Sequence, residues 1–526
     1  MKYRLVLLST LLLSGCQSTG DAQDTDNIAH KAPPIAGQKA SSAPTETAAT
    51  PEKAAPNQPT VLSPQKQEDV WQRISMQLSL PVPNNASVRR YRNWYLNYPN
   101  HLATVTERAT PFLHLIVEKV EARNMPLELA LLPVVESSFD QFAYSHGRAA
   151  GLWQFVPATG RRFGLEQNWW YDGRRDVAQS TDAALDYLEY LHDMFDGNWL
   201  HAIAAYNSGE GRVSRAIRRN EQRGKPTDFW HLDLPKETSS YVPKLIALGD
   251  VLRNKNKYGL DLPEIPNQPV LTMVDPGMQM DLALAANYAG LTVSELQSLN
   301  PAYNHWATSP SGPTHLLLPN DKVARFNTEL AKNKNQGLRV ERYAVKSGDS
   351  LSEIADQYNT TVKVLKRANQ LRSSRIRVGQ RLMIPVSLKD ESQYTLSAPQ
   401  RLAALQTAER DGYKRTHTVR QGDSFWTIAR RYDVDYRQLA KWNGMSPRDT
   451  LSIGQQLVVW DKENNAQRIR TITYRIRQGD SLSTIAHRYK VSVSDLIKWN
   501  QLRQNAYIQP GEQLTLHIDI SRSSGS

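Results

Sequence analysis

The chain has 526 residues, too many for one hydrophobic core, so several domains of roughly 100–200 residues each are expected. It carries 64 Lys and Arg against 52 Asp and Glu. The net charge of +12 fits a polyanionic partner such as nucleic acid, anionic lipid or an acidic cell-wall polymer, or simply a basic solvated surface. A single cysteine excludes a disulfide within the chain.

The first residues have the pattern of an export signal. Lys2 and Arg4 give a positive start, and the run from Leu5 to Leu13 is apolar apart from Ser9 and Thr10. This run is too short to span a bilayer, which takes about 20 residues, and it suits the apolar part of a secretory signal.

The cysteine adds a second feature to this signal. Leu13-Ser14-Gly15-Cys16 resembles a bacterial lipobox, in which the cysteine becomes the acylated N-terminus; the alternative is a plain signal peptide with a chance cysteine. The resemblance implies that residues 1–16 are a lipoprotein signal and that acyl chains on Cys16 anchor a periplasmic protein to a lipid bilayer. Gln17 follows the cysteine, and by the same sorting pattern the outer membrane is favoured over the inner one.

Residues 17–66 are rich in Ser, Thr, Ala, Pro and Gln and have almost no large apolar side chains. Such a segment cannot bury enough surface to offset the entropy of ordering it. The composition predicts a disordered tether that lets the folded part search a volume near the membrane.

Residues 67–265 repeat apolar side chains at helical spacing and predict an all-α domain. The segment 180–195 has one apolar stripe, with a hydroxyl residue, Ser180 or Thr181, as its expected cap. The segment 199–206 is rich in alanine, which allows close contact between helices.

A lone carboxylate, Glu136, closes a segment from Leu127 to Val135 that is apolar apart from Glu128. Pro126 suits the first turn of a helix that puts Glu136 in its last turn, and Pro133 is expected to bend that helix. Apolar neighbours and the negative end of the helix dipole would both raise the pKa of the acid, as a general acid at neutral pH requires. The alternative is a surface glutamate at a helix end.

Hydrogen-bonding side chains follow in short motifs. Ser137 is next to the acid, and Gly151-Leu152-Trp153-Gln154 brings an amide and a glycine that lets the backbone approach a ligand closely. Ala204-Ala205-Tyr206-Asn207 adds a hydroxyl and a second amide. Amides, hydroxyls and flat rings suit an uncharged sugar that bears N-acetyl groups.

No ordered pair of carboxylates accompanies these motifs, in contrast to the usual glycosidase pattern. Asp140, Asp172 and Glu210 are available, but no spacing singles one of them out.

The order and spacing of Glu136-Ser137, Gly-Leu-Trp-Gln and Ala-Tyr-Asn resemble those of the family 1 lytic transglycosylases, which have a goose-type lysozyme fold. The resemblance covers about residues 90–260. It implies that Glu136 is the single catalytic acid and base, and that a glycan groove is lined by Ser137, Gln154, Tyr206 and Asn207.

Two positions fit the family less closely. Many relatives have Met in place of Trp153, so a detail of that subsite is expected to differ. Tyr241, in Thr238-Ser239-Ser240-Tyr241-Val242-Pro243, matches a further family tyrosine loosely, and a buried structural tyrosine is an equal alternative.

The reaction that the resemblance implies needs one carboxyl group. Protonated Glu136 gives its proton to the oxygen that links N-acetylmuramic acid to N-acetylglucosamine, while the acetamido group of the muramic acid stabilises the positive charge. The ionised acid then takes the proton of the 6-hydroxyl, which closes a 1,6-anhydro ring. Water is not consumed, so the enzyme would be a lyase of cell-wall remodelling and turnover, without a metal or cofactor.

Three copies of one unit follow in the C-terminal part. Each opens with Gly-Asp-Ser, at Gly348, Gly422 and Gly479, and an Asn follows each of these glycines 21 residues later. A second Gly and a short apolar run come next. The pattern predicts a small α+β module of strand, helix, helix and strand.

These units resemble LysM modules, which bind glycans that contain N-acetylglucosamine; the alternative is generic protein-interaction repeats. The modules are expected at residues 341–386, 416–460 and 473–517, with the Gly-Asp-Ser loop and the residues before the second strand forming a shallow groove. Uneven spacing predicts separate modules on linkers near 387–414 and 461–471. Three weak modules on one chain gain through effective concentration.

Residues 268–320 look like a worn fourth copy. Aligning Asn300 with Asn369 puts Leu282 on Leu351, but Gln279 and Met280 stand in place of the Gly-Asp pair. The run 316–319 is expected to form the last strand, and the module is expected to pack on the helical domain; its glycan binding is left open.

Two other functions stay open. One is a muramidase that hydrolyses the same bond with water, and the other is a non-catalytic peptidoglycan scaffold. The histidines are scattered, and no glycine-rich phosphate loop precedes a helix. The expected partners are peptidoglycan glycan strands and a lipid bilayer, and nucleic-acid binding, which the net charge alone supports, is not expected.

Overall fold

The computed structural model describes residues 62–333, 336–461, 469–489, 491–503 and 507–519. The predicted signal, Cys16 and the tether up to residue 61 lie outside the described residues. Pro64–Lys66 form a short 3₁₀ helix, η1, so regular structure begins slightly before the predicted start of the helical domain. Within the described ranges, no helix combines the length and apolarity needed to cross a bilayer.

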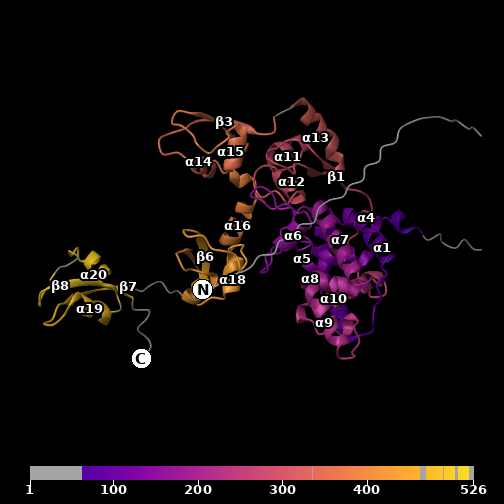
Figure 1. Cartoon of the computed structure of the whole chain (residues 1–526), viewed down its shortest axis with the longest axis horizontal. Coiled ribbons are helices and arrows are strands. Elements are labelled where there is room, and N and C mark those ends of the chain that lie inside the picture. Colours follow the sequence, from indigo (N-terminus) through magenta and orange to yellow (C-terminus); the bar gives the residue numbers. More distant parts are fainter. Residues whose placement is uncertain (1–61, 334–335, 462–468, 490, 504–506, 520–526) are drawn as a thin grey trace, which may run out of the picture. The chain divides into compact units, whose positions relative to one another are not determined.

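The first part of the described chain is helical, as predicted (Figure 1). Its α-helices are α1 (Val70–Ser75), α2 (Ala86–Asn97), α3 (Pro99–Ala109), α4 (Leu113–Ala122), α5 (Leu132–Ser137), α6 (Pro157–Arg162), α7 (Val177–Met194), α8 (Trp199–Ser208), α9 (Glu210–Glu221) and α10 (Lys236–Arg253). Two further 3₁₀ helices are η2 (Leu127–Leu131) and η3 (Phe229–His231).

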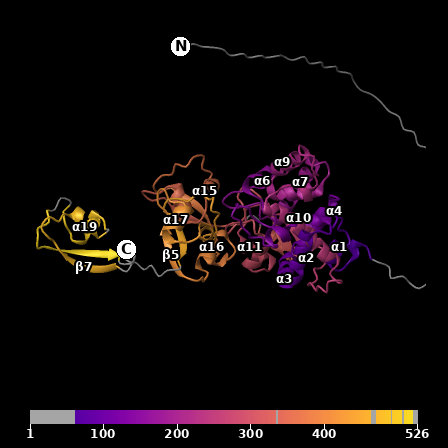
Figure 2. The ribbon, with the colours of Figure 1, turned by 90° about the horizontal axis from the view of Figure 1, so that it is seen from below.

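Helix α10 is central to this domain. It packs against α2, α5, α8 and η2, and nearly every side chain from Tyr241 to Leu252 is buried. Figure 2 shows α10 beside α2, in agreement with their close contact. Because the core closes around α10, segments that lie far apart in the sequence meet along its sides.

The helix predicted to lead to Glu136 is divided in two. Residues 127–131 form the 3₁₀ helix η2, and α5 begins at Leu132, with Pro133 in its first turn. The prediction of one bent helix was therefore wrong in detail: Pro133 has no N–H to donate, so the α-helix starts at this point. Glu136 does lie in the last turn of α5.

The long helix α7 begins earlier than predicted. Asp176, not Ser180 or Thr181, caps it by accepting a hydrogen bond from the N–H of Gln179 at 2.8 Å. Ser180 and Thr181 are buried inside the helix. The prediction of the cap was wrong because the apolar stripe extends back to Val177, which is itself buried.

The worn fourth copy has the expected LysM-like order of elements. Its strands β1 (Leu271–Val274) and β2 (Leu316–Pro319) pair antiparallel and flank α11 (Leu282–Ala289) and α12 (Val293–Leu299), with α13 (Asn320–Lys332) following. It packs on the helical domain: the N–H of Asp172 donates to the carbonyl of Ala302 at 2.9 Å, and His315 pairs with Asp176 at 2.7 Å. This packing was predicted.

Three α+β modules follow, each with one two-stranded antiparallel sheet and two helices. The first has β3 (Arg339–Ala344), α14 (Leu351–Gln357), α15 (Val362–Ala368) and β4 (Arg381–Val386). The second has β5 (Tyr413–Thr418), α17 (Phe425–Tyr432), α18 (Tyr436–Trp442) and β6 (Gln456–Asp461). The third has β7 (Ile469–Arg475), α19 (Leu482–Arg488), α20 (Val493–Trp499) and β8 (Gln513–Asp519).

The repeated asparagine holds the second strand of each unit. In the first module the amide of Asn369 donates to the carbonyl of Met383 at 2.7 Å and accepts from its N–H at 2.6 Å. Asn300 makes the same pair of bonds to Leu317, at 2.9 and 2.7 Å. The shared arrangement confirms that residues 268–320 align with the other modules through Asn300.

The Gly-Asp-Ser loops also have a structural role. Asp349 accepts hydrogen bonds from the N–H of Lys346 at 2.6 Å and the hydroxyl of Tyr343 at 2.8 Å, while Ser350 caps α14. Gly348 has a φ of +94°, a conformation that glycine adopts without strain. The loop therefore fixes the start of the helix in each copy.

The segment 387–414 is not the free linker that was predicted. It contains η4 (Glu391–Gln393) and α16 (Ala398–Thr407). Tyr394 between them is fully buried and donates to the carboxylate of Asp281 at 2.9 Å, and Asp281 also accepts from the N–H of Leu388 at 2.7 Å. Tyr394, a large aromatic residue within a polar run, was the signal in the sequence that this segment packs against the protein. Most of the second predicted linker, 462–468, lies outside the described residues.

Candidate active site

Glu136 comes at the end of the short helix α5. The helix stops because Ser138, its cap, and Phe139 both have positive φ values, 52° and 56°. These left-handed residues turn the chain sharply and leave Glu136 half-buried at the wall of a cavity. The turn therefore fixes the position of Glu136 while its side chain faces the cavity.

Tyr241 of α10 contacts the acid directly. Its hydroxyl donates to Oε1 of Glu136 at 2.6 Å, a bond that joins residues 105 positions apart. Tyr241 is almost completely buried, and burial together with the nearby Glu136 keeps the pKa of its phenol well above the usual value. Tyr241 is therefore both buried, as the alternative of a structural tyrosine expected, and a hydrogen-bond donor to Glu136.

The pKa of Glu136 is raised to about 7, chiefly because burial disfavours the charged form. The hydrogen bond from Tyr241 lowers this pKa, whereas the negative charge of Glu237 raises it. We expected apolar surroundings and the helix end to raise the pKa of Glu136, and burial is the largest cause of the shift. An acid with this pKa is about half protonated at neutral pH.

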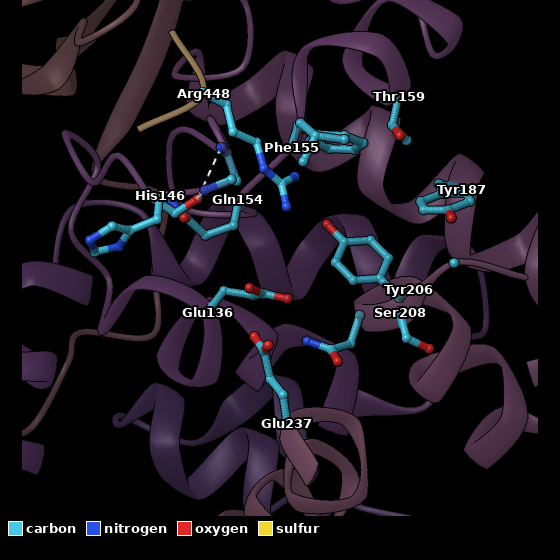
Figure 3. Close-up of a pocket in the computed structure, with 16 residues that line it drawn as sticks. Glu136, His146, Gln154, Phe155, Thr159, Tyr187, Tyr206, Ser208, Glu237 and Arg448 are labelled. Atoms are coloured by element: carbon cyan, nitrogen blue, oxygen red, sulfur yellow. Dashed lines mark hydrogen bonds between the residues drawn. The ribbon is translucent and has the colours of Figure 1, made fainter. Parts of the chain in front are cut away.

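The cavity beside Glu136 has a volume of about 770 Å³ (Figure 3). Backbone and side chains from α5, α6, α7, α8, α10 and the loops between them form its wall. The lining residues are Glu136, Ser145, His146, Gly147, Ala149, Gln154, Phe155, Val156, Thr159, Tyr187, Tyr206, Asn207, Ser208, Gly209, Glu237 and Arg448. Three predicted site residues, Gln154, Tyr206 and Asn207, thus share one cavity with the predicted acid.

Gln154 is positioned by the loop that the Gly-Leu-Trp-Gln motif forms. Its Nε2 donates to the carbonyl of Gly151 at 2.8 Å, which leaves Oε1 for a ligand. Gly151 has a φ of +79°, and a Cβ there would lie 2.0 Å from the carbonyl oxygen of Arg174. Glycine is needed at this position because the loop passes close to the neighbouring backbone.

Tyr206 and Asn207 come from the end of α8. Tyr206 donates its hydroxyl to the carbonyl of Trp153 at 2.8 Å, so the two motifs are bonded to each other. The Oδ1 of Asn207 accepts from the hydroxyl of Thr238 at 2.9 Å, which leaves its amide N–H groups for a ligand. These bonds fix the orientation of both side chains toward the cavity.

Ser137 and Trp153, which were expected at the glycan groove, do not line the cavity. The hydroxyl of Ser137 bonds to the carbonyls of Pro133 and Leu152, at 3.1 and 3.0 Å, and Ser137 is outside the cavity lining. Its predicted contact with sugar stays a prediction. The ring of Trp153 is fully buried, and its Nε1 donates to Thr181 at 3.0 Å, so its exchange for Met changes the core and not the cavity wall.

The carboxylates considered from the sequence are engaged elsewhere. Asp172 pairs with Arg174 at 2.8 Å and with Arg175 at 2.7 Å. Asp140 accepts from the N–H of Phe142 at 2.9 Å, and Glu210 accepts from Tyr187 at 3.2 Å. None of the three lines the cavity.

Glu237 was missed in the sequence. It lies in the first turn of α10, lines the cavity and points toward Glu136 in Figure 3. It stands four residues before Tyr241, so the two share one side of the helix, and this spacing was the available signal. Arg448, from the second α+β module, was missed as well and is the cationic side chain of the lining.

Within the described residues, no group of three or more His, Cys, Asp or Glu side chains is placed to hold a metal ion.

Family models match five segments of the chain. The "Transglycosylase SLT domain" matches residues 115–229, and the "Lytic transglycosylase MltD, LysM-like domain" matches residues 270–335. The "LysM domain" matches residues 343–385, 417–460 and 474–516. These segments contain the cavity residues of α5 to α8 and the four α+β units.

Several proteins with curated names are similar to this chain. The membrane-bound lytic murein transglycosylase D of Escherichia coli strain K12 is 38% identical over 476 residues, which are 88% of this chain and 99% of that protein. A protein of Alteromonas sp. strain M-1 named for tributyltin chloride resistance is 46% identical over 168 residues, 32% of this chain and 79% of that one.

A solved structure is similar over a smaller part. The 70 kDa soluble lytic transglycosylase SLT70 of Escherichia coli is 18% identical over 36% of this chain and 33% of that one, with a TM-score of 0.24. The similarity to the Escherichia coli transglycosylase D is the decisive one, because it covers 88% of this chain and 99% of that protein. The chain belongs to the family of membrane-bound lytic murein transglycosylase D.

Proposed function

We propose that this peptidoglycan lytic transglycosylase uses Glu136 as its only catalytic acid and base. The bond it cleaves is the β-1,4 bond between N-acetylmuramic acid and N-acetylglucosamine, and the product ends in 1,6-anhydro-N-acetylmuramic acid. The observation that carries the proposal is the position of Glu136 at a cavity wall, where burial raises its pKa to about 7. An acid needs its proton before the first step.

The hydrogen bond from Tyr241 divides the roles of the two carboxyl oxygens. Oε1 of Glu136 accepts from Tyr241, so Oε2 is left to carry the proton and give it to the glycosidic oxygen. Once Glu136 is ionised, the same hydrogen bond stabilises the carboxylate until it accepts the proton of the 6-hydroxyl. Tyr241 is thus a positioning residue for both steps.

The two amides of the cavity present complementary groups to the sugar. Gln154 has a free acceptor, Oε1, which suits a hydroxyl or an acetamido N–H. Among the described residues the amide N–H groups of Asn207 have no acceptor, so they suit the acetamido carbonyl, while the hydroxyl of Tyr206 is already donated to Trp153. A sugar with an N-acetyl group offers both kinds of partner, which supports substrate-binding roles for Gln154, Tyr206 and Asn207.

Hydrolysis of the same bond is the second candidate, and Glu237 is the observation that favours it. A carboxylate in the same cavity could activate a water molecule, as the base of a glycosidase does. Mass analysis of the products separates the two reactions, because an anhydro end is lighter than a hydrolysed end by one water. Anhydro ends are expected; reducing ends alone would contradict the proposal.

The pH dependence of cleavage tests the environment of Glu136. Activity should fall as pH rises through about 7, because Glu136 must be protonated. Glu237→Gln removes a like charge, so the pKa of Glu136 falls and this limb of the kcat/KM profile moves to lower pH. Tyr241→Phe removes a bond to the carboxylate, so the limb moves to higher pH. Shifts of the same sign in both variants would contradict these roles.

We propose that a lipid anchor at Cys16 holds the protein on a membrane; the name of the Escherichia coli relative gives a membrane-bound state for that protein. The proposal places the protein in the periplasm, held by an acylated Cys16 on the outer membrane, with Gln17 as the sorting residue. The supporting observation is the position of the single cysteine directly after a short apolar signal.

Cys16→Ala should release the protein from membranes. In cells, the wild type is expected in the outer-membrane fraction after density-gradient separation, and the variant in the soluble or uncleaved precursor fraction. Metabolic labelling with a fatty acid should mark the wild type only. A variant that fractionates with the outer membrane as the wild type does would exclude Cys16 as the anchor.

A further inference from the structure

The cavity of the helical domain receives one side chain from another domain. Arg448 lies in the loop between α18 and β6 of the second LysM module, and Figure 3 shows its guanidinium pointing into the cavity. The other charged or acidic groups of the lining are Glu136 and Glu237. Since arginine keeps its charge at every physiological pH, Arg448 is the permanent cation of this cavity.

The loop that carries Arg448 is held against the rim of the cavity. Asp449, only 14% exposed, pairs with Arg148 at 2.7 Å and accepts from the hydroxyl of Tyr144 at 3.4 Å. Ser446 is fully buried, and its hydroxyl donates to the carbonyl of His146. These contacts lie on both sides of Arg448 in the loop, so they fix the direction in which its side chain points.

The guanidinium of Arg448 has no partner among the residues that the structure describes. No ion pair or side-chain hydrogen bond joins it to another residue that the structure describes; its backbone N–H donates to Ser446 at 3.2 Å. By contrast, the neighbouring charges of the loop and rim, Asp449 and Arg148, are paired with each other. An unpaired guanidinium in a substrate cavity suits a planar carboxylate, to which it can donate two parallel hydrogen bonds.

We infer that Arg448 binds a carboxylate of the glycan strand next to the bond that is cleaved, so that the second LysM module completes a specificity subsite of the enzyme. The carboxylate belongs either to the lactyl group of N-acetylmuramic acid or to its stem peptide. This inference rests on the proposed function, because a muramyl strand must occupy the cavity. It gives the module a role in choosing the substrate in addition to holding the polymer.

Three substrates test the inference with the full-length chain and Arg448→Gln. They are peptide-free strands with free lactyl carboxylates, the same strands with these carboxylates converted to amides, and peptide-bearing strands. Arg448→Gln is expected to lower kcat/KM on a carboxylate substrate by about tenfold to a hundredfold, the worth of a charge-assisted hydrogen bond. On the amidated strands the wild type should fall to the level of the variant.

The pattern of losses identifies the source of the carboxylate. A loss on peptide-free strands assigns it to the lactyl group, and a loss on peptide-bearing strands alone assigns it to the stem peptide. An equal loss on charged and amidated strands, no loss on either carboxylate substrate, or a gain of activity would each overturn the inference. Arg437→Gln, on the exposed side of α18 in the same module, is the matched control and should change none of the three.

A second variant separates docking of the loop from the guanidinium itself. Asp449→Asn weakens the pair with Arg148 and should give the same substrate-selective loss, while Arg448→Lys should restore part of it. The proposed function is tested separately from the role of Arg448: it is wrong if the wild type makes no anhydro ends or does not need Glu136. In that case the comparison of charged and amidated strands still reports whether Arg448 selects carboxylates.

Discussion

Glu136→Gln should reduce cleavage of peptidoglycan by at least about 10²–10⁴-fold, which is the usual contribution of general acid–base catalysis. The amide has no proton to give to the glycosidic oxygen and cannot accept the proton of the 6-hydroxyl. Its carbonyl oxygen can still accept the hydrogen bond of Tyr241, so binding of glycan should change little. Release of anhydro-muropeptides, followed by mass spectrometry, measures the loss, and residual turnover near wild type would remove Glu136 from its role.

The stability of the same variant is an independent check. The folded-state pKa of Glu136 is about 7, above the ordinary value of 4.5, so burial of the ionised acid costs stability as pH rises above about 4.5. Glu136→Gln should therefore unfold at the same temperature as wild type at pH 4 and at a higher temperature at pH 8. The gain at pH 8 is at most about 3 kcal/mol. A destabilised variant at pH 8 would indicate misfolding and disqualify its activity data.

Deleting residues 340–526 should weaken binding to intact sacculi by about a hundredfold or more, because linked weak modules gain that much through effective concentration. Cosedimentation with purified sacculi measures the binding. Short soluble fragments should still be cleaved, because the helical domain and Glu136 remain. Equal binding of sacculi by the shortened chain would count against the modules.

The deletion also removes Tyr394 and Arg448, so a full-length variant is needed beside it. Val378 and Ile453, which precede the second strands of the first two modules, are 70% and 74% exposed. Val378→Asp with Ile453→Asp would disturb the predicted grooves without touching a core. This double variant should lose sacculus binding and keep the preference for carboxylate substrates.

The sequence predicted the helical domain, the modules and the acid because each has a local signature. Glu136 stands in a short motif, and the Gly-Asp-Ser loops recur with a constant distance to an asparagine. The alignment through Asn300 was correct because one side chain makes two fixed hydrogen bonds to the second strand, and such geometry tolerates little change.

The structure was needed where residues meet across long distances in the chain. The local sequence marks Glu237 only by its spacing of four residues from Tyr241, and it reaches the cavity through the packing of α10 against α5. Arg448 approaches the cavity through the contact of Ser446 with His146, residues 300 positions apart. The segment 387–414 was predicted as a linker because a polar run normally indicates one, whereas its Tyr394 is buried and donates to the buried Asp281.

Because Tyr241 lies on α10 and Glu136 on α5, their hydrogen bond makes the pKa of Glu136 depend on how these two helices pack. A small slide of α10 along α5 would stretch a 2.6 Å bond and change the proton affinity of the acid. The alkaline limb of the pH–activity profile therefore reports how closely α10 packs on α5. An inhibitor that binds away from the sugar site, or a core substitution that loosens the contact between α5 and α10, would shift this alkaline limb before the protein unfolds.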